Sequence, residues 1–222
     1  MDFTKYFKEY ENIVAIAEYS FEQVKQAYPK CMSFRIICAD CCYAVFDIGL
    51  IEALYINWHF NDKIGGANRD FIIGQANKAD RKAYQLKKRA YKEVKDGKNE
   101  QEVVVKMSLE RIECPLLTED KLCALYDYRP ITCRLYGIPI HIGGLAHTCG
   151  RTGFEENKEY KTVKIEILQQ KLYDLSVKVI KDIKSKHPDL FKMLIPVSMA
   201  LLTEYNEEAL GVPINKEKQV AE

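Results

Sequence analysis

Residues 114–134 have the sequence CPLLTEDKLCALYDYRPITCR, which is rich in turn-forming residues and has no helical repeat of apolar side chains. Pro115 and Pro130 each fix φ and keep the preceding residue out of the helical region. The stretch carries three cysteines: Cys114, Cys123 and Cys133. Residues 114–150 therefore predict a loop-rich region with one small hairpin, held together by a metal rather than by a large core.

A second cysteine group precedes this region. Cys38 and Cys41 form a CxxC chelate, whose spacing lets both thiolates turn toward one metal or cluster, and Cys42 follows directly. Adjacent cysteines point in different directions, so Cys41 and Cys42 either serve two metal atoms or one of them only supports the site. Asp40 predicts an N-cap that would place this group at a helix N-terminus, where thiol pKa values fall.

The sequence predicts a reducing compartment for these cysteines. The chain has 222 residues, 33 Lys and Arg against 32 Asp and Glu, 47% hydrophobic residues and eight cysteines. No signal peptide or membrane span is predicted, and a net charge of +1 does not favour nucleic-acid binding by the whole surface. We expect a cytoplasmic protein with thiolate–metal chemistry; a redox dithiol and unreactive buried thiols are the alternatives.

Outside the cysteine groups, apolar residues recur at helical spacing. We predict a mostly α fold, with helices packed around the loop-rich metal-binding region. The expected helices cover residues 2–28, 41–59, 77–96, 100–112, 160–185 and 189–209, the last kinked near Pro196. We expect one domain, 1–222, with a cysteine-cluster region at 31–150 and a C-terminal helical part at 160–209.

One predicted helix, 77–96, has a strongly basic face. Its cations are Lys78, Arg81, Lys82, Lys87, Lys88, Arg89, Lys92 and Lys95, against Asp80, Glu93 and Asp96. Such a face can bind phosphates or an acidic partner, although a plain solvated surface is the favoured interpretation.

The cysteine pattern resembles a known family. A CxxCC group, then Cys-Pro-Leu-Leu, Leu-Cys-x-Leu-Tyr, Arg-Pro-x-x-Cys-Arg (129–134) and a last cysteine are similar to the CxxCxxCC cysteine-cluster family, described as zinc- or iron-chelating. By this resemblance the metal ligands are Cys38, Cys41, Cys42, Cys114, Cys123, Cys133 and Cys149. The family's first cysteine would fall at Arg35, so Cys31 is a candidate replacement, and His141 or His147 could complete a shell.

Two cofactors remain open at this point. An iron–sulfur cluster, of the 4Fe-4S type, is favoured over zinc, because the second group has no CxxC pair and cluster ligands can be scattered. The predicted function is metal binding, with the centre as clip, sensor or electron carrier. The alternatives are a cluster-dependent enzyme, for instance in protein lysine methylation as the resemblance implies, and a zinc-stabilised binding module. A cavity beside the centre would favour the enzyme; the partner, protein or small molecule, is unknown.

Overall fold

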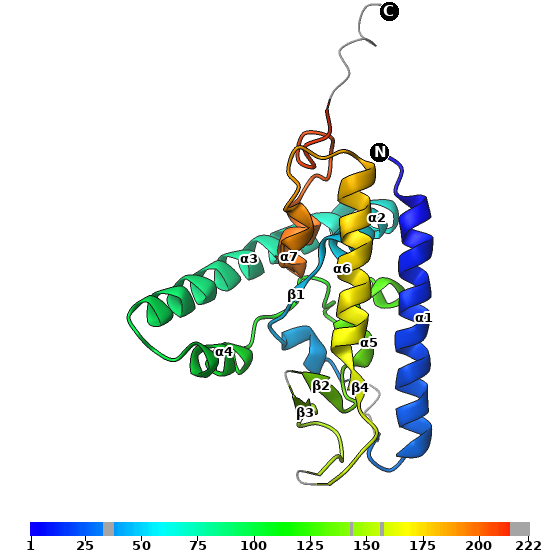
Figure 1. Ribbon diagram of the computed structural model, residues 1–222, viewed down its shortest axis with the longest axis vertical. Helices are drawn as coiled ribbons and strands as arrows, with labels where there is room; N and C mark the ends of the chain where they lie inside the picture. The colour runs from blue at the N-terminus through cyan, green and yellow to red at the C-terminus, as the bar shows by residue number, and fades with distance from the viewer. Residues whose placement is uncertain (33–37, 143, 156–157, 214–222) are drawn as a thin grey trace, which may run out of the picture.

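The computed structural model describes residues 1–32, 38–142, 144–155 and 158–213, and the described chain is mostly helical (Figure 1). The helices are α1 (Thr4–Ala27), α2 (Leu50–Lys63), α3 (Gly66–Lys95), α4 (Glu100–Ser108), α5 (Ile131–Leu135), α6 (Ile165–Asp182) and α7 (Val197–Leu202). Short 3-10 helices are η1 (Asp40–Tyr43), η2 (Tyr126–Tyr128) and η3 (Leu190–Lys192). The strands are β1 (Asp47–Ile48), β2 (Ile140–Ile142), β3 (Leu145–His147), β4 (Val163–Lys164) and β5 (Ile195–Pro196). The predicted mostly α fold is confirmed.

Helix α2 is the centre of the core. It is apolar on all sides, and most of its residues are buried, from Leu50 to Phe60. A helix of this kind is stable only when other elements surround it, and α2 packs against α1, α6 and α7. Helices α1 and α6 run side by side and are amphipathic, so each buries one stripe against this core (Figure 1).

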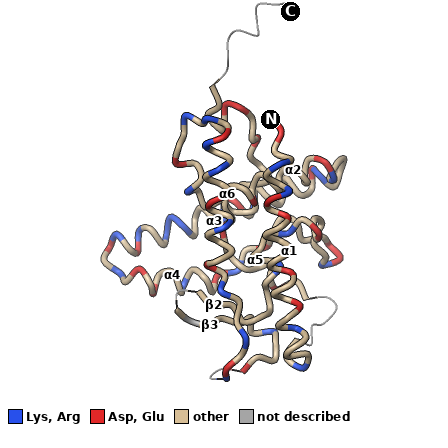
Figure 2. The backbone as a smooth tube through the Cα atoms, turned by 45° about the vertical axis from the view of Figure 1, so that its right-hand side comes forward, with Lys and Arg blue, Asp and Glu red and all other residues tan. Residues whose placement is uncertain are grey.

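Helices α3 and α4 form a hairpin that projects from the rest of the molecule (Figure 1). The N-terminal part of α3 packs against α7, and its buried residues are Ile72, Ala76, Ala79, Ala83 and Leu86. Lys and Arg residues follow one another along the projecting part of α3 (Figure 2). No helix in the described part of the chain is long and apolar enough to cross a membrane.

Two small sheets join distant parts of the chain. Strand β1 pairs antiparallel with β5, with Asp47 opposite Pro196. Strand β2 pairs antiparallel with β3, which confirms the predicted hairpin, and parallel with β4. The β2–β4 pairing therefore attaches the loop-rich region to the start of α6, and the β1–β5 pairing joins the segment before α2 to the segment before α7.

Two predicted helices are wrong in part. The predicted helix 41–59 begins at Leu50, because residues 42–44 instead pair with residues 111–114. Asp40 caps no long helix: its carboxylate accepts hydrogen bonds from Arg111 and from the Tyr136 hydroxyl, both at 2.7 Å. The predicted helix 189–209 is replaced by η3, β5 and the short α7, because the backbone at 195–196 pairs with β1.

The remaining predicted helices are present with shifted ends. Helix α3 begins at Gly66 rather than at residue 77, and α4 ends at Ser108 rather than at residue 112. Helix α6 covers 165–182 of the predicted 160–185, after the short strand β4.

Candidate metal centre

Six cysteines from the two sequence groups line one cavity of about 590 Å³. They are Cys38, Cys41, Cys42, Cys114, Cys123 and Cys133. All eight cysteines of the chain are free thiols. The cavity lining also includes apolar residues, Ala79, Ala83 and Leu86 of α3 and Pro196 and Val197.

Backbone pairing brings the two cysteine groups together. The Cys114 N–H donates to the Cys42 carbonyl at 2.7 Å, and the Ile112 N–H donates to the Tyr43 carbonyl at 3.1 Å. Cys123 is held by a bridge to Leu117 within the second group. These bonds fix the main chain around the cavity, so the thiols are positioned by the fold and not only by a metal.

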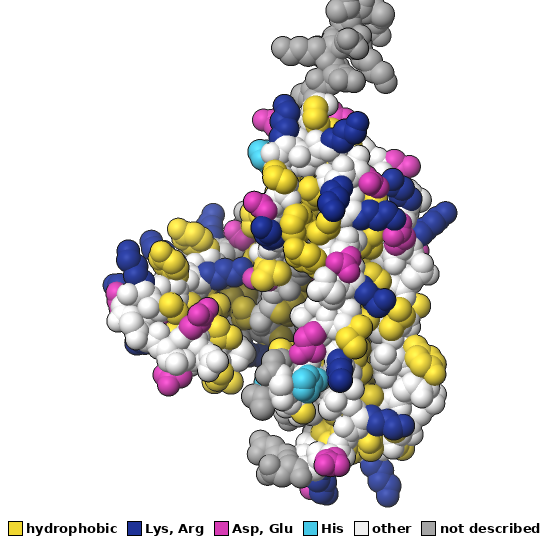
Figure 3. All heavy atoms as spheres, in the orientation of Figure 1, with side chains coloured by type: hydrophobic (Ala, Val, Ile, Leu, Met, Phe, Trp, Pro, Cys, Tyr) yellow, Lys and Arg dark blue, Asp and Glu magenta, His cyan; other side chains and the backbone are white. Residues whose placement is uncertain are grey.

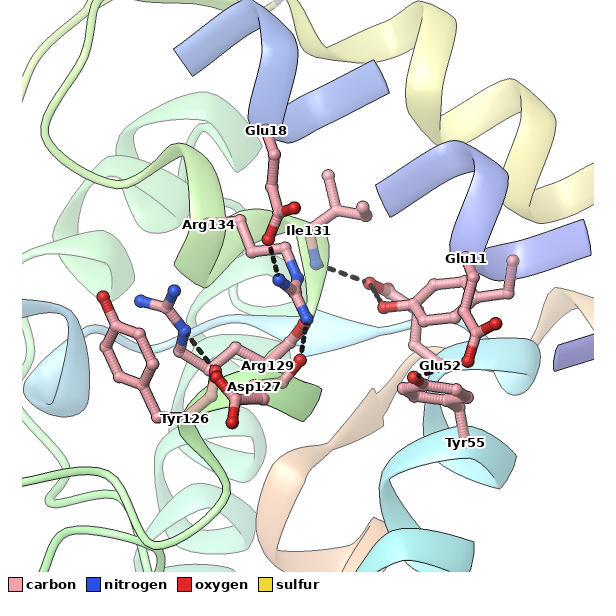
Figure 4. Close-up of polar contacts among 10 residues, drawn as sticks. Glu11, Glu18, Glu52, Tyr55, Tyr126, Asp127, Arg129, Ile131 and Arg134 are labelled. Carbon is pink, nitrogen blue, oxygen red and sulfur yellow. Dashed lines mark hydrogen bonds and ion pairs between the residues drawn. The ribbon is translucent and has the colours of Figure 1, made fainter. Parts of the chain in front are cut away.

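Helix α5, which carries Cys133, is held in place by a buried carboxylate on α2. Glu52 is buried, and its Oε1 accepts a hydrogen bond from the Ile131 N–H at 2.8 Å (Figure 4). Pro130 precedes Ile131 and has no N–H of its own, so Ile131 is the first donor at this helix end. Burial raises the pKa of Glu52, although the hydrogen bonds from Ile131 and Gly49 oppose this shift.

The two arginines of the Arg-Pro-x-x-Cys-Arg motif, Arg129 and Arg134, make different contacts. Arg134 is buried, pairs with Glu18 of α1, and donates to the carbonyls of Asp127 and, at 2.8 Å, Arg129 (Figure 4). It therefore ties the loop before Cys133 to α1. Arg129 faces the cavity, stacks on the Tyr126 ring at 3.5 Å and donates from Nε to the Tyr126 carbonyl at 2.6 Å.

The thiols influence one another's pKa values. Cys41 and Cys42 lie with their Sγ atoms 4.0 Å apart. Their hydrogen bond lowers the pKa of Cys41 to about 7, against the cost of burial and with help from the Arg129 guanidinium, and it raises the pKa of Cys42. Burial raises the pKa of Cys114 to about 12, and burial also raises the pKa values of Cys123 and Cys133.

This donor set fits a thiophilic metal. Cysteine thiolates are the ligands of structural zinc and of iron–sulfur clusters, and a bound cation reverses the cost of ionising buried thiols. Within the described residues, no group of three His, Cys, Asp or Glu side chains is arranged to hold a single metal ion. The cavity therefore brings the sulfurs into one space without fixing a single-ion shell.

The comparison with known proteins agrees with this chemistry. Residues 30–160 match the family model CxxCxxCC, described as "Putative zinc- or iron-chelating domain". The chain belongs to the CxxCxxCC family. No curated protein and no solved structure matches the chain.

The CxxCxxCC match covers more cysteines than the cavity does. Cys149 is half-buried and lies outside the cavity lining. Cys31 also lies outside the lining, with its carbonyl accepting a hydrogen bond from the Gly153 N–H at 2.9 Å. Arg35, where the family has its first cysteine, falls outside the described residues.

None of the four histidines lines the cavity among the described residues. His141 is paired with Glu166, with 3.6 Å between Nδ1 and Oε1, and His147 is exposed on β3. His59 lies within α2 and stacks on Tyr128, with 3.6 Å between ring centroids. Burial lowers the pKa of His59 to about 4.

Three supporting residues of the CxxCxxCC site could not be identified from the cysteine pattern. Glu52 is a lone carboxylate in the apolar run 50–60, and that isolation was the available signal. Tyr136 and Arg111 bond to Asp40 beside the CxxC group, across about 70 to 100 residues of sequence. No local pattern marks such a contact.

Proposed function

We propose that this CxxCxxCC protein binds an iron–sulfur cluster through thiolates of both cysteine groups, with zinc as the alternative metal. The observation that supports the proposal is the single cavity lined by Cys38, Cys41, Cys42, Cys114, Cys123 and Cys133. Cys149 is a seventh candidate ligand. The family description supports zinc or iron chelation in general terms.

The number of thiols favours a cluster over one zinc ion. A structural zinc site is closed by four ligands, whereas six thiols share this cavity. In a cluster each thiolate binds a different iron, so ligands from separate loops suffice. When bound, an iron–sulfur cluster supplies electron transfer or a Lewis-acidic iron.

The residues around the cysteines suit an anionic centre. Arg129 faces the cavity, and its guanidinium already lowers the pKa of Cys41. A cation that faces the cavity offsets the negative charge of a thiolate-ligated centre and raises its reduction potential. Leu116 and Leu125 are buried near the cysteines and limit access of water.

A cluster-dependent enzyme is the second candidate, supported by the shape of the cavity. Ala79, Ala83 and Leu86 of α3 line the cavity together with the cysteines and give it apolar lining. Cavities of a few hundred Å³ with apolar walls and few polar groups are typical of small-molecule or substrate sites. In this alternative, the apolar lining admits a substrate group beside the centre.

The test is elemental analysis of protein purified without oxygen, with iron, zinc and acid-labile sulfide measured per chain. We expect iron and sulfide in equal amounts, about four of each for a cubane cluster. Zinc without sulfide would refute the cluster and leave a structural zinc site. Absence of both metals would refute the proposed function altogether.

Cys133→Ser and Cys31→Ser form a matched pair for the ligand assignment. Each replaces one thiol by a hydroxyl, but only Cys133 lines the cavity. We expect Cys133→Ser to lose at least half of the bound iron and Cys31→Ser to retain it. Equal loading of the two variants would contradict the assignment.

A further inference from the structure

The projecting part of α3 carries a regular stripe of exposed side chains. Its members are Arg81, Tyr84, Lys88, Tyr91 and Lys95, which we call the α3 outer stripe. They are spaced by three, four, three and four residues, so they lie along one side of the helix over about 21 Å. The buried positions Ala79, Ala83 and Leu86 lie on the opposite side.

The two tyrosines of the stripe are among the most exposed aromatic residues of the described chain. Tyr84 is 65% and Tyr91 71% exposed. Figure 3 shows hydrophobic and basic side chains together on the hairpin of α3 and α4. Tyrosine is enriched at protein interfaces, where its ring supplies contact area at a small entropic cost.

The three cations of the stripe have no acidic partner. Neither Arg81, Lys88 nor Lys95 makes an ion pair or side-chain hydrogen bond with any residue that the structure describes. No Asp or Glu lies three or four residues from any of them; their helical neighbours are Tyr, Gln, Asn and Lys. By contrast, Lys87 and Arg89 of the same helix and Lys106 of α4 all pair with carboxylates.

The unpaired cations of the stripe repel one another, so an acidic partner would stabilise α3. Like charges three or four residues apart repel one another, and Lys88, Lys92 and Lys95 stand at such spacings. The nearest carboxylate on the helix, Asp80, is half-buried at the edge of the stripe, and Glu93 bonds to Lys98 and Lys106 on the other side. The stripe itself is therefore uniformly positive.

We propose that the α3 outer stripe is a docking surface for an acidic amphipathic helix of another protein. The spacing places cations at the first and tyrosines at the fourth position of a heptad, which is the pattern of a helix–helix contact. Glutamates of the partner would meet Arg81, Lys88 and Lys95, and apolar residues would cover Tyr84 and Tyr91. The balanced total charge of the chain, +1, favours this local contact over nucleic-acid binding.

The test uses a fluorescein-labelled peptide of three heptads, with Glu at the first and Leu at the fourth position and Ala elsewhere. A control peptide has Lys in place of Glu. Fluorescence anisotropy with the full-length, metal-loaded protein measures both. We expect micromolar binding of the acidic peptide at low salt, at least fivefold weaker binding at 0.5 M NaCl because charges are screened, and no binding of the control peptide.

Two variants decide whether the stripe is responsible. The double substitution Tyr84→Ala and Tyr91→Ala should weaken binding at least fivefold, and Lys88→Glu should weaken it further. Tyr19→Ala is the matched control, because Tyr19 is 67% exposed on α1, away from the stripe, and should leave binding unchanged. Circular dichroism and metal content verify that each variant is folded and loaded.

Three outcomes would overturn the proposal. These are no binding of the acidic peptide, equal binding by the stripe variants and Tyr19→Ala, or binding of a labelled oligothymidine in place of the peptide. The last outcome would assign the stripe to single-stranded nucleic acid. Because metal content is measured separately, failure of this proposal is distinct from failure of the proposed metal centre.

Discussion

Replacing Glu52 by alanine should destabilise the protein and release the helix that carries Cys133. Glu52 accepts a hydrogen bond from the Ile131 N–H at 2.8 Å in the core. Alanine leaves that N–H without a partner, at a cost of about 1–3 kcal/mol. It also removes the carboxyl group and one buried methylene, the methylene being worth about 0.8 kcal/mol. We expect a total loss of about 3 kcal/mol in the free energy of unfolding.

The matched variant is Glu52→Gln, which keeps an acceptor oxygen and nearly the same volume. Burial raises the pKa of Glu52 above its ordinary value of 4.5. Folding therefore favours the protonated carboxyl, and the wild type loses stability as the pH rises above 4.5 toward the raised pKa. Glutamine does not titrate, so the free energy of unfolding of Glu52→Gln relative to that of the wild type should increase between pH 4 and pH 8.

The assay is urea unfolding of metal-free protein, followed by circular dichroism at pH 7 and repeated from pH 4 to pH 8. Anaerobic metal loading of the same variants reports on the site. A loss below 1 kcal/mol for Glu52→Ala, with full metal loading, would refute the claim that this carboxylate positions α5.

Three further predictions concern the cysteine region. Arg134→Lys should lower the free energy of unfolding, measured in urea, by about 2 kcal/mol, because a lysine ammonium group cannot make all the hydrogen bonds that the Arg134 guanidinium makes to Glu18 and two carbonyls. A loss below 0.5 kcal/mol would contradict this role. In metal-free protein, alkylation of Cys41 by iodoacetamide, followed by peptide mass spectrometry, should be half-maximal near pH 7. Arg129→Ala should move this midpoint to higher pH, because it removes a cation that stabilises the Cys41 thiolate. An unchanged midpoint would refute this role of Arg129. Cys123→Ala should lower bound iron per chain because it removes a thiol that lines the cavity; an unchanged iron content would exclude Cys123 as a ligand.

The helices of this protein could be predicted where one stripe of apolar residues faces the core. Helices α1 and α6 are of this kind, and both appear close to their predicted positions. The segment 41–49 could not be predicted, because its apolar residues continue the pattern of α2. Its backbone instead bonds to residues 112–114, as in the bond from the Cys114 N–H to the Cys42 carbonyl. Such a long-range pairing overrides local propensity.

The candidate site could be predicted as a set of residue types but not as an arrangement. Clustering of cysteines in a chain expected to be cytoplasmic indicated a thiolate site, and six of the seven candidates line one cavity. The separate position of Cys149 depends on how the hairpin of β2 and β3 packs, which sequence spacing does not determine.

The most direct test of the account is X-ray absorption spectroscopy at the iron and zinc edges of protein purified without oxygen. Sulfur neighbours at about 2.3 Å, with a second shell of iron scatterers, are the predicted result, and Cys133→Ser should replace part of the sulfur signal by oxygen. A first shell of only nitrogen and oxygen, or a sulfur shell unchanged in Cys133→Ser, would contradict thiolate ligation in this cavity.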